Sequence, residues 1–245
     1  MGTRVKIMGL EVDLLTQETL EHEIAGYLAN DYLNVVHMIS LDYIDTYDEN
    51  ELVQNELKEA DMVLPGERAI LSAHHVDVLE TGGMAVNYQS VFALVEPLEL
   101  AERSFYFILR NEKEAKTVSS YWNRHFPKEK NLGVCIATDD TTEESIVNDI
   151  NMKLPDIVVL SMDSTQQEEW ISRNKARLNA KLCLVCGSIM PMILKENVHV
   201  PVVLRRLHLG GFYRMFVRFP YTHFFRRRIF KQKMEDYITK KKLER

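Results

Sequence analysis

The first candidate for chemistry is a charged pair that directly follows an apolar, strand-like run. After Met62–Leu64 the chain turns at Pro65-Gly66 and then presents Glu67 and Arg68. A carboxylate in such a loop can act as a general base that takes a proton from a hydroxyl nucleophile. Glu67 is therefore the leading candidate for a catalytic residue.

Polar residues or glycines also follow the other apolar runs. They are Ser40 and Asp42, Gly66, Arg110 and Asn111, Asp139 and Asp140, Asp163 to Gln167, and Gly187 and Ser188. Ligands of parallel α/β sheets bind beyond the carboxyl ends of the strands. These positions are thus the candidates for binding, provided that the runs form one parallel sheet.

The segment SMDSTQQEEWI, residues 161–171, ends a strand-like run and begins a helical one. Free N–H groups at such a helix start can receive a phosphate or a sugar hydroxyl. A well-capped helix with a solvated first turn explains the same pattern, so both interpretations stay open. The pair Asp139-Asp140 directly precedes another helical run. Acidic residues at this position are better explained by helix capping than by metal binding.

The elements that must position these residues alternate along the chain. Strand-like runs are expected at 5–9, 34–40, 61–65, 104–110, 132–138, 156–162 and 181–187, and helical runs at 16–30, 41–60, 111–126, 141–154 and 165–179. Nearly continuous apolar strands between helices indicate a parallel sheet that is covered on both faces. The sequence predicts a Rossmann-like α/β domain with a basic, aromatic C-terminal helical appendage.

Cysteine and histidine, two residue types that often bind metals, have ordinary structural explanations here. Cys183 and Cys186 lie three apart in an apolar strand, where their side chains point to opposite faces, so we expect buried free thiols. Cys135 is expected to be buried in the same way, and His37 inside a strand is expected to be structural. Such cysteine usage is typical of a reduced, cytoplasmic protein.

The charge is unevenly distributed, although the net charge is only −6. Residues 199–245 hold 13 Lys and Arg against 3 Asp and Glu, interleaved with aromatic side chains. A membrane interface suits this composition, and a helix pair packed on the body is a second interpretation. Nucleic acid is a third interpretation, which the acidic body opposes. We predict a domain at 1–198 and a membrane-facing appendage at 199–245.

No motif for phosphate-loop, serine-hydrolase or zinc-protease chemistry occurs in the sequence. No apolar run approaches the roughly 18 to 20 residues that are needed to span a bilayer. The first residues alternate charged and apolar types and do not resemble a signal peptide.

Five segments, in order along the chain, together resemble the WecG/TagA/CpsF family of bacterial glycosyltransferases. They are VKIMGLEVDLLTQETLEHEI (5–24), LNVVHMISLDYI (33–44), EADMVLPGERAIL (59–71), the stretch from LPDIVVLSMDSTQQEEWI to KLCLVCGS (154–188), and VPVVLRRLHLGGFYRMF (200–216). Both the spacing and the order of the segments match.

The resemblance implies transfer of an N-acetylhexosamine, typically N-acetylmannosamine, from a UDP-sugar donor to a polyprenyl-diphosphate-linked acceptor sugar. It implies inversion, no metal or other cofactor, and a product used in cell-surface polysaccharide synthesis. It also implies a peripheral position on the inner face of the cell membrane, and a homo-oligomer or a partner glycosyltransferase. No nucleic-acid partner is expected, because the body of the chain is acidic.

The residues at the family's motif positions differ in this chain. Gly66 stands where the family has its catalytic Asp, and Glu67 follows it; Met38 and Ser40 replace a Thr-x-Asn pair. The glycine-containing turn after the fourth strand is Arg110-Asn111, whereas Gln167 is retained. Two hypotheses follow: an active, divergent transferase with Glu67 as base, or a non-catalytic relative that serves as a subunit or regulator.

The predicted site residues fall into three groups. The catalytic residue is Glu67; the donor- or acceptor-binding residues are Ser40, Asp42, Gly66, Asp163, Gln167, Gly187, Arg214 and Arg227; the membrane-contacting residues are Arg218, Phe224, Phe225, Arg226, Arg228 and Lys231. No metal ligand is predicted.

Overall fold

A computed structural model describes residues 3–67, 70–71, 103–125, 131–137, 142–187, 190, 228–237 and 239. The chain divides into two compact units, residues 1–190 and 191–245. The first unit contains the sheet and the candidate catalytic residue.

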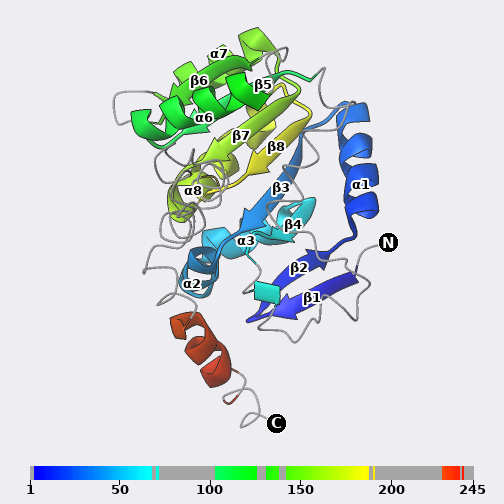
Figure 1. The fold of residues 1–245 in the computed structure, drawn as a ribbon, viewed down its shortest axis with the longest axis vertical. Coiled ribbons are helices and arrows are strands. Elements are labelled where there is room, and N and C mark those ends of the chain that lie inside the picture. Colours follow the sequence, from blue (N-terminus) through cyan, green and yellow to red (C-terminus); the bar gives the residue numbers. More distant parts are fainter. Residues whose placement is uncertain are drawn as a thin grey trace, which may run out of the picture. The chain divides into compact units, whose positions relative to one another are not determined.

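The first unit is built on a six-stranded sheet in which every neighbouring pair is parallel. Its strands are β3 (Asn34–Ile39), β4 (Met62–Pro65), β5 (Phe105–Leu109), β6 (Asn131–Ile136), β7 (Ile157–Ser161) and β8 (Leu182–Val185). They lie in the order β4-β3-β8-β7-β5-β6 (Figure 1). The predicted Rossmann-like α/β class is confirmed.

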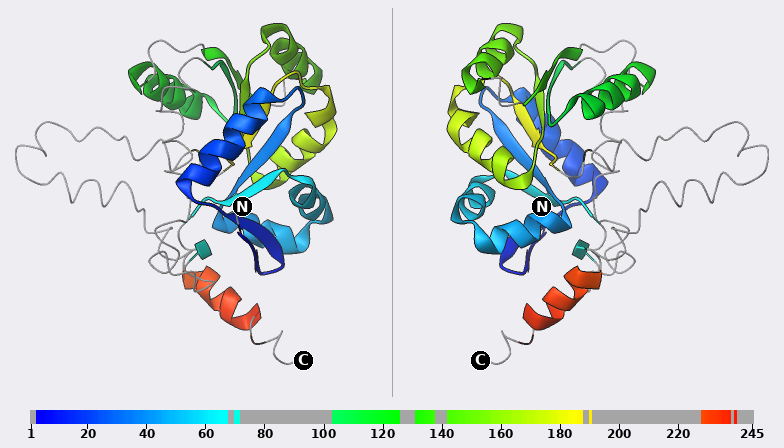
Figure 2. Two further views of the ribbon diagram at one scale, coloured as in Figure 1. Left: turned by 90° about the vertical axis from the view of Figure 1, so that its right-hand side faces the viewer. Right: turned by 90° about the vertical axis from the view of Figure 1, so that its left-hand side faces the viewer.

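Helices cover both faces of this sheet, as Figure 2 shows for α6 on one side and α7 with α8 on the other. The helices are α1 (Gln17–Ala29), α2 (Leu41–Glu49), α3 (Glu51–Glu59), α6 (Glu112–His125), α7 (Glu143–Lys153) and α8 (Ser164–Asn174). α2 and α3 both contact α8, so these three helices share one face. The side chains of β3, β4, β5, β7 and β8 are all buried, which explains their continuous apolar runs.

The strand order places a topological switch point between β5 and β7. The chain leaves β5 toward β6 in one direction and leaves β7 toward β8 in the other. Ligands of open α/β sheets bind in the crevice at the carboxyl ends of such strands. Arg110, which follows β5, and Asp163, which follows β7, therefore stand at this crevice.

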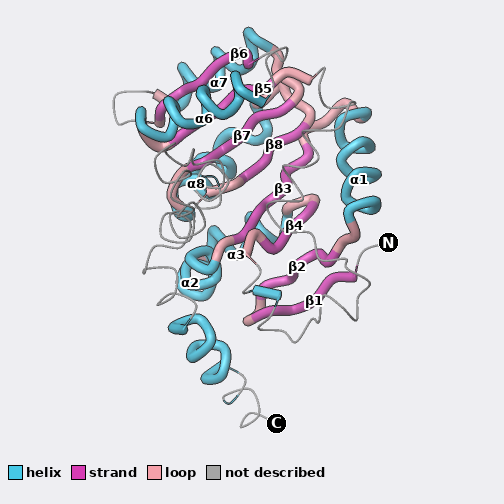
Figure 3. The backbone as a smooth tube through the Cα atoms, viewed as in Figure 1, coloured by secondary structure: helices cyan, strands magenta, loops and turns pink. Residues whose placement is uncertain are grey.

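The first predicted strand does not belong to the parallel sheet. β1 (Thr3–Ile7) pairs antiparallel with β2 (Leu10–Leu14) in a separate hairpin (Figure 3). The two loop residues, Met8 and Gly9, both have positive φ angles of 48° and 85°, which suits the twist of a two-residue hairpin turn. The sequence did not predict this turn, because a methionine rarely adopts a positive φ angle.

The helix predicted over 41–60 is two helices, α2 and α3, separated at Asn50. The Asn50 side chain accepts hydrogen bonds from the backbone N–H groups of Leu52 and Val53 and so caps α3. Thr16 caps α1, because its hydroxyl accepts a hydrogen bond from the backbone N–H of Thr19.

The structural interpretation of the cysteines and of His37 is largely confirmed. Cys183, Cys186 and His37 are buried, and all three cysteines are free. Cys135 differs from the prediction: it is only partly buried, because it lies on the edge strand β6.

In the second unit the structure describes one helix, over residues 228–237. Phe230 and Met234 are buried and lie one helical turn apart, whereas Arg228 and Lys231 are exposed. Among the described residues, no helix is long and apolar enough to cross a membrane.

Candidate functional site

The carboxyl edge of the sheet gathers the predicted residues of the first unit. Ser40 follows β3, Gly66 and Glu67 follow β4, Asp163 follows β7 and Gly187 follows β8. Because neighbouring parallel strands end at the same edge, residues far apart in the chain become neighbours there. The polar residues of this edge form two clusters, one at the ends of β3 and β4 and one at the ends of β5, β7 and β8.

At β4, Glu67 caps the helix that follows β3. Its side chain is buried, and Oε1 accepts a hydrogen bond of 3.0 Å from the backbone N–H of Leu41. Ser40, the N-cap residue of α2, makes no side-chain capping bond, so the Glu67 carboxylate fulfils that role. The N–H of Gly66 donates to the carbonyl of Ile39 over 2.8 Å, which fixes the loop against β3.

The remaining predicted residue of this region, Asp42, lies in the first turn of α2 and is partly exposed. The backbone carbonyl of Asp42 accepts a hydrogen bond from the hydroxyl of Thr46. The same Thr46 hydroxyl lies 3.0 Å from the hydroxyl of Ser164 and so links α2 to the first turn of α8.

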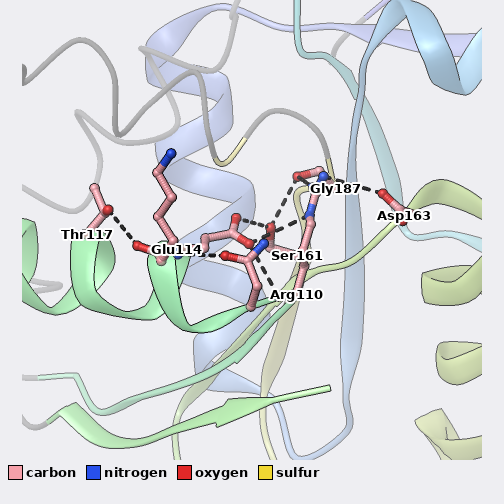
Figure 4. A network of polar contacts seen from close by, with 8 residues as sticks. Arg110, Glu114, Thr117, Ser161, Asp163 and Gly187 are labelled. Carbon is pink, nitrogen blue, oxygen red and sulfur yellow. Dashed lines mark hydrogen bonds and ion pairs between the residues drawn. The ribbon is translucent and has the colours of Figure 1, made fainter. Parts of the chain in front are cut away.

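At β5, β7 and β8, a network centred on Arg110 crosses the switch point (Figure 4). Arg110 Nη2 donates to the carbonyl oxygen of Gly187 over 3.3 Å, and Nη1 lies 3.3 Å from Asp163 Oδ1. Arg110 Nε lies 3.7 Å from Glu114 Oε2. The hydroxyl of Ser161 donates to Glu114 Oε1 over 2.6 Å. Sequence reasoning singled out Arg110 as a strand-end residue but missed Glu114 and Ser161, which carry no motif.

Gln167 lies under this network on the first turns of α8. Its side chain is fully buried, yet neither amide atom has a hydrogen-bond partner among the described residues. Gly187 has a positive φ of 44°, and a Cβ at that position would stand 3.1 Å from the Gln167 amide atoms. The glycine therefore lets the amide approach the end of β8, where it can serve a ligand.

The next residue of α8, Glu168, faces the core instead. Its Oε1 accepts a hydrogen bond from the hydroxyl of Tyr43 and lies 3.5 Å from His37 Nδ1. Burial raises the pKa of Glu168 well above its usual value and lowers the pKa of His37 to about 3. Burial thus favours the neutral form of both groups, and we name Glu168, Tyr43 and His37 the core cluster.

Several predicted residues lie outside the described part of the chain. They are Asp139, Asp140, Ser188, Arg214, Arg218, Phe224, Phe225, Arg226 and Arg227. The cap of α7 is Thr142, whose hydroxyl accepts from the N–H of Ser145. Within the described ranges, no group of three or more His, Cys, Asp or Glu side chains could hold a metal ion.

Comparison with known sequences identifies the relatives of this fold. The profile of the "Glycosyl transferase WecG/TagA/CpsF family" matches residues 5–230. A relative from Staphylococcus aureus (strain MRSA252), an N-acetylglucosaminyldiphosphoundecaprenol N-acetyl-beta-D-mannosaminyltransferase, is 20% identical over 233 residues. The match covers 87% of this chain and 85% of that protein. Because the family profile spans nearly the whole chain, the predicted resemblance is confirmed: the chain belongs to the WecG/TagA/CpsF family of glycosyltransferases.

Proposed function

We propose that this chain transfers an N-acetylhexosamine, in the first instance N-acetylmannosamine, from a UDP-sugar to a polyprenyl-diphosphate-linked sugar. Family membership supports transferase activity, and the activity for which the Staphylococcus relative is named supports this choice of sugar and acceptor. The observation that carries the proposal is the Glu67 carboxylate, held at the carboxyl edge of the sheet one residue after the family's Asp position.

The proposed reaction is a single displacement at the anomeric carbon. The acceptor hydroxyl oxygen attacks that carbon, the bond from the carbon to the UDP oxygen breaks, and its electron pair leaves with UDP. The acceptor proton passes to Glu67, which acts as general base. The configuration at the anomeric carbon inverts, because the nucleophile enters on the side opposite the leaving group.

The other predicted residues have supporting roles in this proposal. Ser40, Asp42, Gly66, Gln167 and Gly187 line the donor or acceptor at the carboxyl edge, and Arg214 and Arg227 offset the charge that develops on the diphosphate. The basic, aromatic tail rests on anionic lipid at the inner face of the cell membrane, which would bring the site to its lipid-linked acceptor.

A second function is favoured by the role of Glu67 in the structure. Its Oε1 already accepts from the N-terminus of α2, and the side chain is only 5% exposed. A carboxylate that serves as a helix cap does not need to be a base. The second candidate is therefore a non-catalytic relative that acts as a subunit or regulator in a polysaccharide pathway.

Calorimetry with UDP, followed by turnover with UDP-N-acetylmannosamine and a polyprenyl-diphosphate-linked N-acetylglucosamine, separates the two functions. For a transferase we expect UDP binding, turnover, and a fall in kcat of about 10²- to 10⁴-fold in Glu67→Gln. Glu59→Gln, on the exposed part of α3, is the matched control and should leave kcat unchanged.

The outcomes of this experiment are distinct. UDP binding without turnover supports the non-catalytic relative, and absence of UDP binding at millimolar concentration refutes the transferase. Turnover that Glu67→Gln leaves unchanged refutes Glu67 as base. A thermal melt of Glu67→Gln is needed beside these assays, because a neutral amide caps the helix N-terminus less strongly than a carboxylate and lowers stability by up to about 1 kcal/mol.

Vesicle co-sedimentation tests the proposed membrane role of the tail in the full chain. Replacing Arg226, Arg227 and Arg228 by Ser should reduce binding to phosphatidylglycerol vesicles by roughly 1 kcal/mol per arginine, or about fivefold each. Neutral phosphatidylcholine vesicles serve as the comparison. Equal binding of the variant and the parent chain to anionic vesicles would refute the role.

A further inference from the structure

The Arg110 guanidinium has spare hydrogen-bonding capacity at the switch point. It carries five N–H donors, but among the described residues its side chain donates one hydrogen bond, to the carbonyl of Gly187. Nε is buried and makes no hydrogen bond there. The side chain reaches from the end of β5 across β7 to the end of β8, about 10 Å at ordinary strand spacing. It thus spans the crevice where ligands of this fold class bind.

The two acidic partners of Arg110 differ sharply in their surroundings. Glu114 is only 6% exposed, and it also accepts from the hydroxyl of Ser161 and from the backbone N–H of Arg110. The Asp163 side chain is 70% exposed, and an ion pair of that kind contributes little to stability because water competes with it. Glu114 therefore anchors the arginine, whereas Asp163 is a partner that a stronger anion can displace.

Two further features of α8 point to an anion at this place. Asp163 is the N-cap residue of this eleven-residue helix, but its carboxylate makes no capping bond, and the first turn contains no acidic residue. The N-terminal N–H groups and the positive end of the helix dipole are thus left for an anion. Gln167, fully buried without a hydrogen-bond partner among the described residues, adds an amide donor and acceptor against Gly187.

We propose that Arg110 is a diphosphate-binding residue and that Asp163 is its exchangeable internal counter-ion. Without ligand, Arg110 pairs with Asp163; with ligand, the same guanidinium binds two oxygens of a diphosphate, and Asp163 turns to solvent. Bidentate pairing with phosphate is the geometry that a guanidinium favours. The inference deepens the proposed function, since both the UDP-sugar and the polyprenyl acceptor contain a diphosphate.

Binding of UDP and of geranyl diphosphate to the full chain, measured by calorimetry, tests this exchange. Arg110→Gln should weaken binding of the relevant diphosphate about tenfold to a hundredfold. Asp163→Asn should tighten it about twofold to fivefold, because the competing carboxylate is gone. Arg173→Gln is the matched control: it removes an exposed arginine that pairs with Glu143 and Glu169, and it should not change Kd.

The two ligands identify the source of the diphosphate. An effect of both variants on UDP alone assigns Arg110 to the donor, and an effect on geranyl diphosphate alone assigns it to the acceptor. Added KCl should weaken wild-type binding more than binding by Arg110→Gln. Circular dichroism checks that Arg110→Gln and Asp163→Asn are both folded; the Asp163 side chain is 70% exposed.

The failures of the two proposals remain distinguishable. Unchanged Kd in Arg110→Gln, or weaker binding in Asp163→Asn, overturns the exchange while wild-type UDP binding still supports the transferase. Geranyl diphosphate binding that depends on both residues, with no UDP binding, keeps the exchange and refutes the transferase. Absence of binding to either diphosphate overturns both.

Discussion

The core cluster and the network around Arg110 use adjacent parts of the same helix in opposite ways. Glu168 turns into the core, where burial favours the neutral forms of it and of His37, and where the Tyr43 hydroxyl donates to its Oε1. Asp163, five residues earlier at the N-cap of the helix, pairs with Arg110 at the partly exposed crevice. Burial makes a polar group costly to disturb and sensitive to pH, whereas exposure makes it exchangeable and sensitive to salt. The contrast separates polar groups that hold the fold from those that are available to a ligand.

Deleting the central member of the core cluster should have the largest effect. Glu168→Ala leaves a cavity and removes the acceptor of the Tyr43 hydroxyl, so we expect the free energy of unfolding to fall by about 3 kcal/mol. Urea denaturation measures this change. The control is Glu169→Ala, the next residue, whose side chain is 46% exposed and pairs only distantly with Arg173; it should cost less than about 0.5 kcal/mol. An equal loss of unfolding free energy in both variants would show that Glu168 stabilises the fold no more than an exposed glutamate does.

The pH dependence of stability should show the two buried groups acting with opposite signs. The folded pKa of His37, about 3, is below its ordinary 6.5, so its contribution to stability is lost as pH falls below 6.5. The folded pKa of Glu168 is above its ordinary 4.5, so its contribution is lost as pH rises above 4.5. Between these values the two effects offset each other in the wild type.

Replacing one of the two groups exposes the pH dependence of stability that the other group causes. Between pH 4.5 and about 6, His37→Gln should become less stable with rising pH and Glu168→Gln more stable, by up to about 1.4 kcal/mol per pH unit each. Urea denaturation at half-unit steps provides the measurement. His22→Gln, at an exposed position on α1, is the control and should follow the wild type. Parallel curves for the two core variants would contradict the neutral state of the cluster.

At the crevice, Gly187→Ala should cost about 1 to 2 kcal/mol. The left-handed backbone at φ 44° disfavours any side chain, and the new methyl group would crowd the Gln167 amide at 3.1 Å. Thermal unfolding detects the change. Gly26→Ala is a control of opposite sign, since a Cβ there meets nothing within 4 Å and an alanine inside α1 should stabilise by about 0.5–1 kcal/mol.

The smallest effect on stability is expected for Asp163→Asn. The exposed pair with Arg110 should contribute less than about 1 kcal/mol, and 1 M NaCl should remove most of that difference. Thermal melts of both proteins at low and high salt measure it. A salt-independent loss of several kcal/mol would show that Asp163 belongs with the buried structural groups, and the contrast with Glu168 would disappear.

Sequence patterns predicted the parallel sheet because its strands are apolar on both faces and alternate with helices. They did not predict the hairpin turn at Met8 and Gly9, whose conformation is unusual for methionine, or the break at Asn50, where a side chain competes with the helix for backbone N–H groups. Capping of Leu41 by Glu67 depends on the pairing of β3 with β4, a long-range contact without a local signal.

The network around Arg110 shows the same limit more strongly. Arg110, Ser161 and Gly187 are separated by long stretches of chain, and only the order β8-β7-β5 brings them together. Sequence position could show that each follows or ends a strand. It could not show that the arginine lies over the neighbouring strands, because strand order is set by the packing of the whole domain.

The hairpin also affects how readily the edge of the parallel sheet can pair with strands of other molecules. β4 ends the parallel sheet, and β2 packs next to it, with the Asp13 carboxylate accepting the backbone N–H of Val63 over 2.8 Å. An unprotected outer strand offers its free amide groups to strands of other chains, which is a common route to aggregation. The Asp13 carboxylate occupies one backbone N–H group of this border and places a charge beside it, which disfavours pairing with a strand of a second molecule.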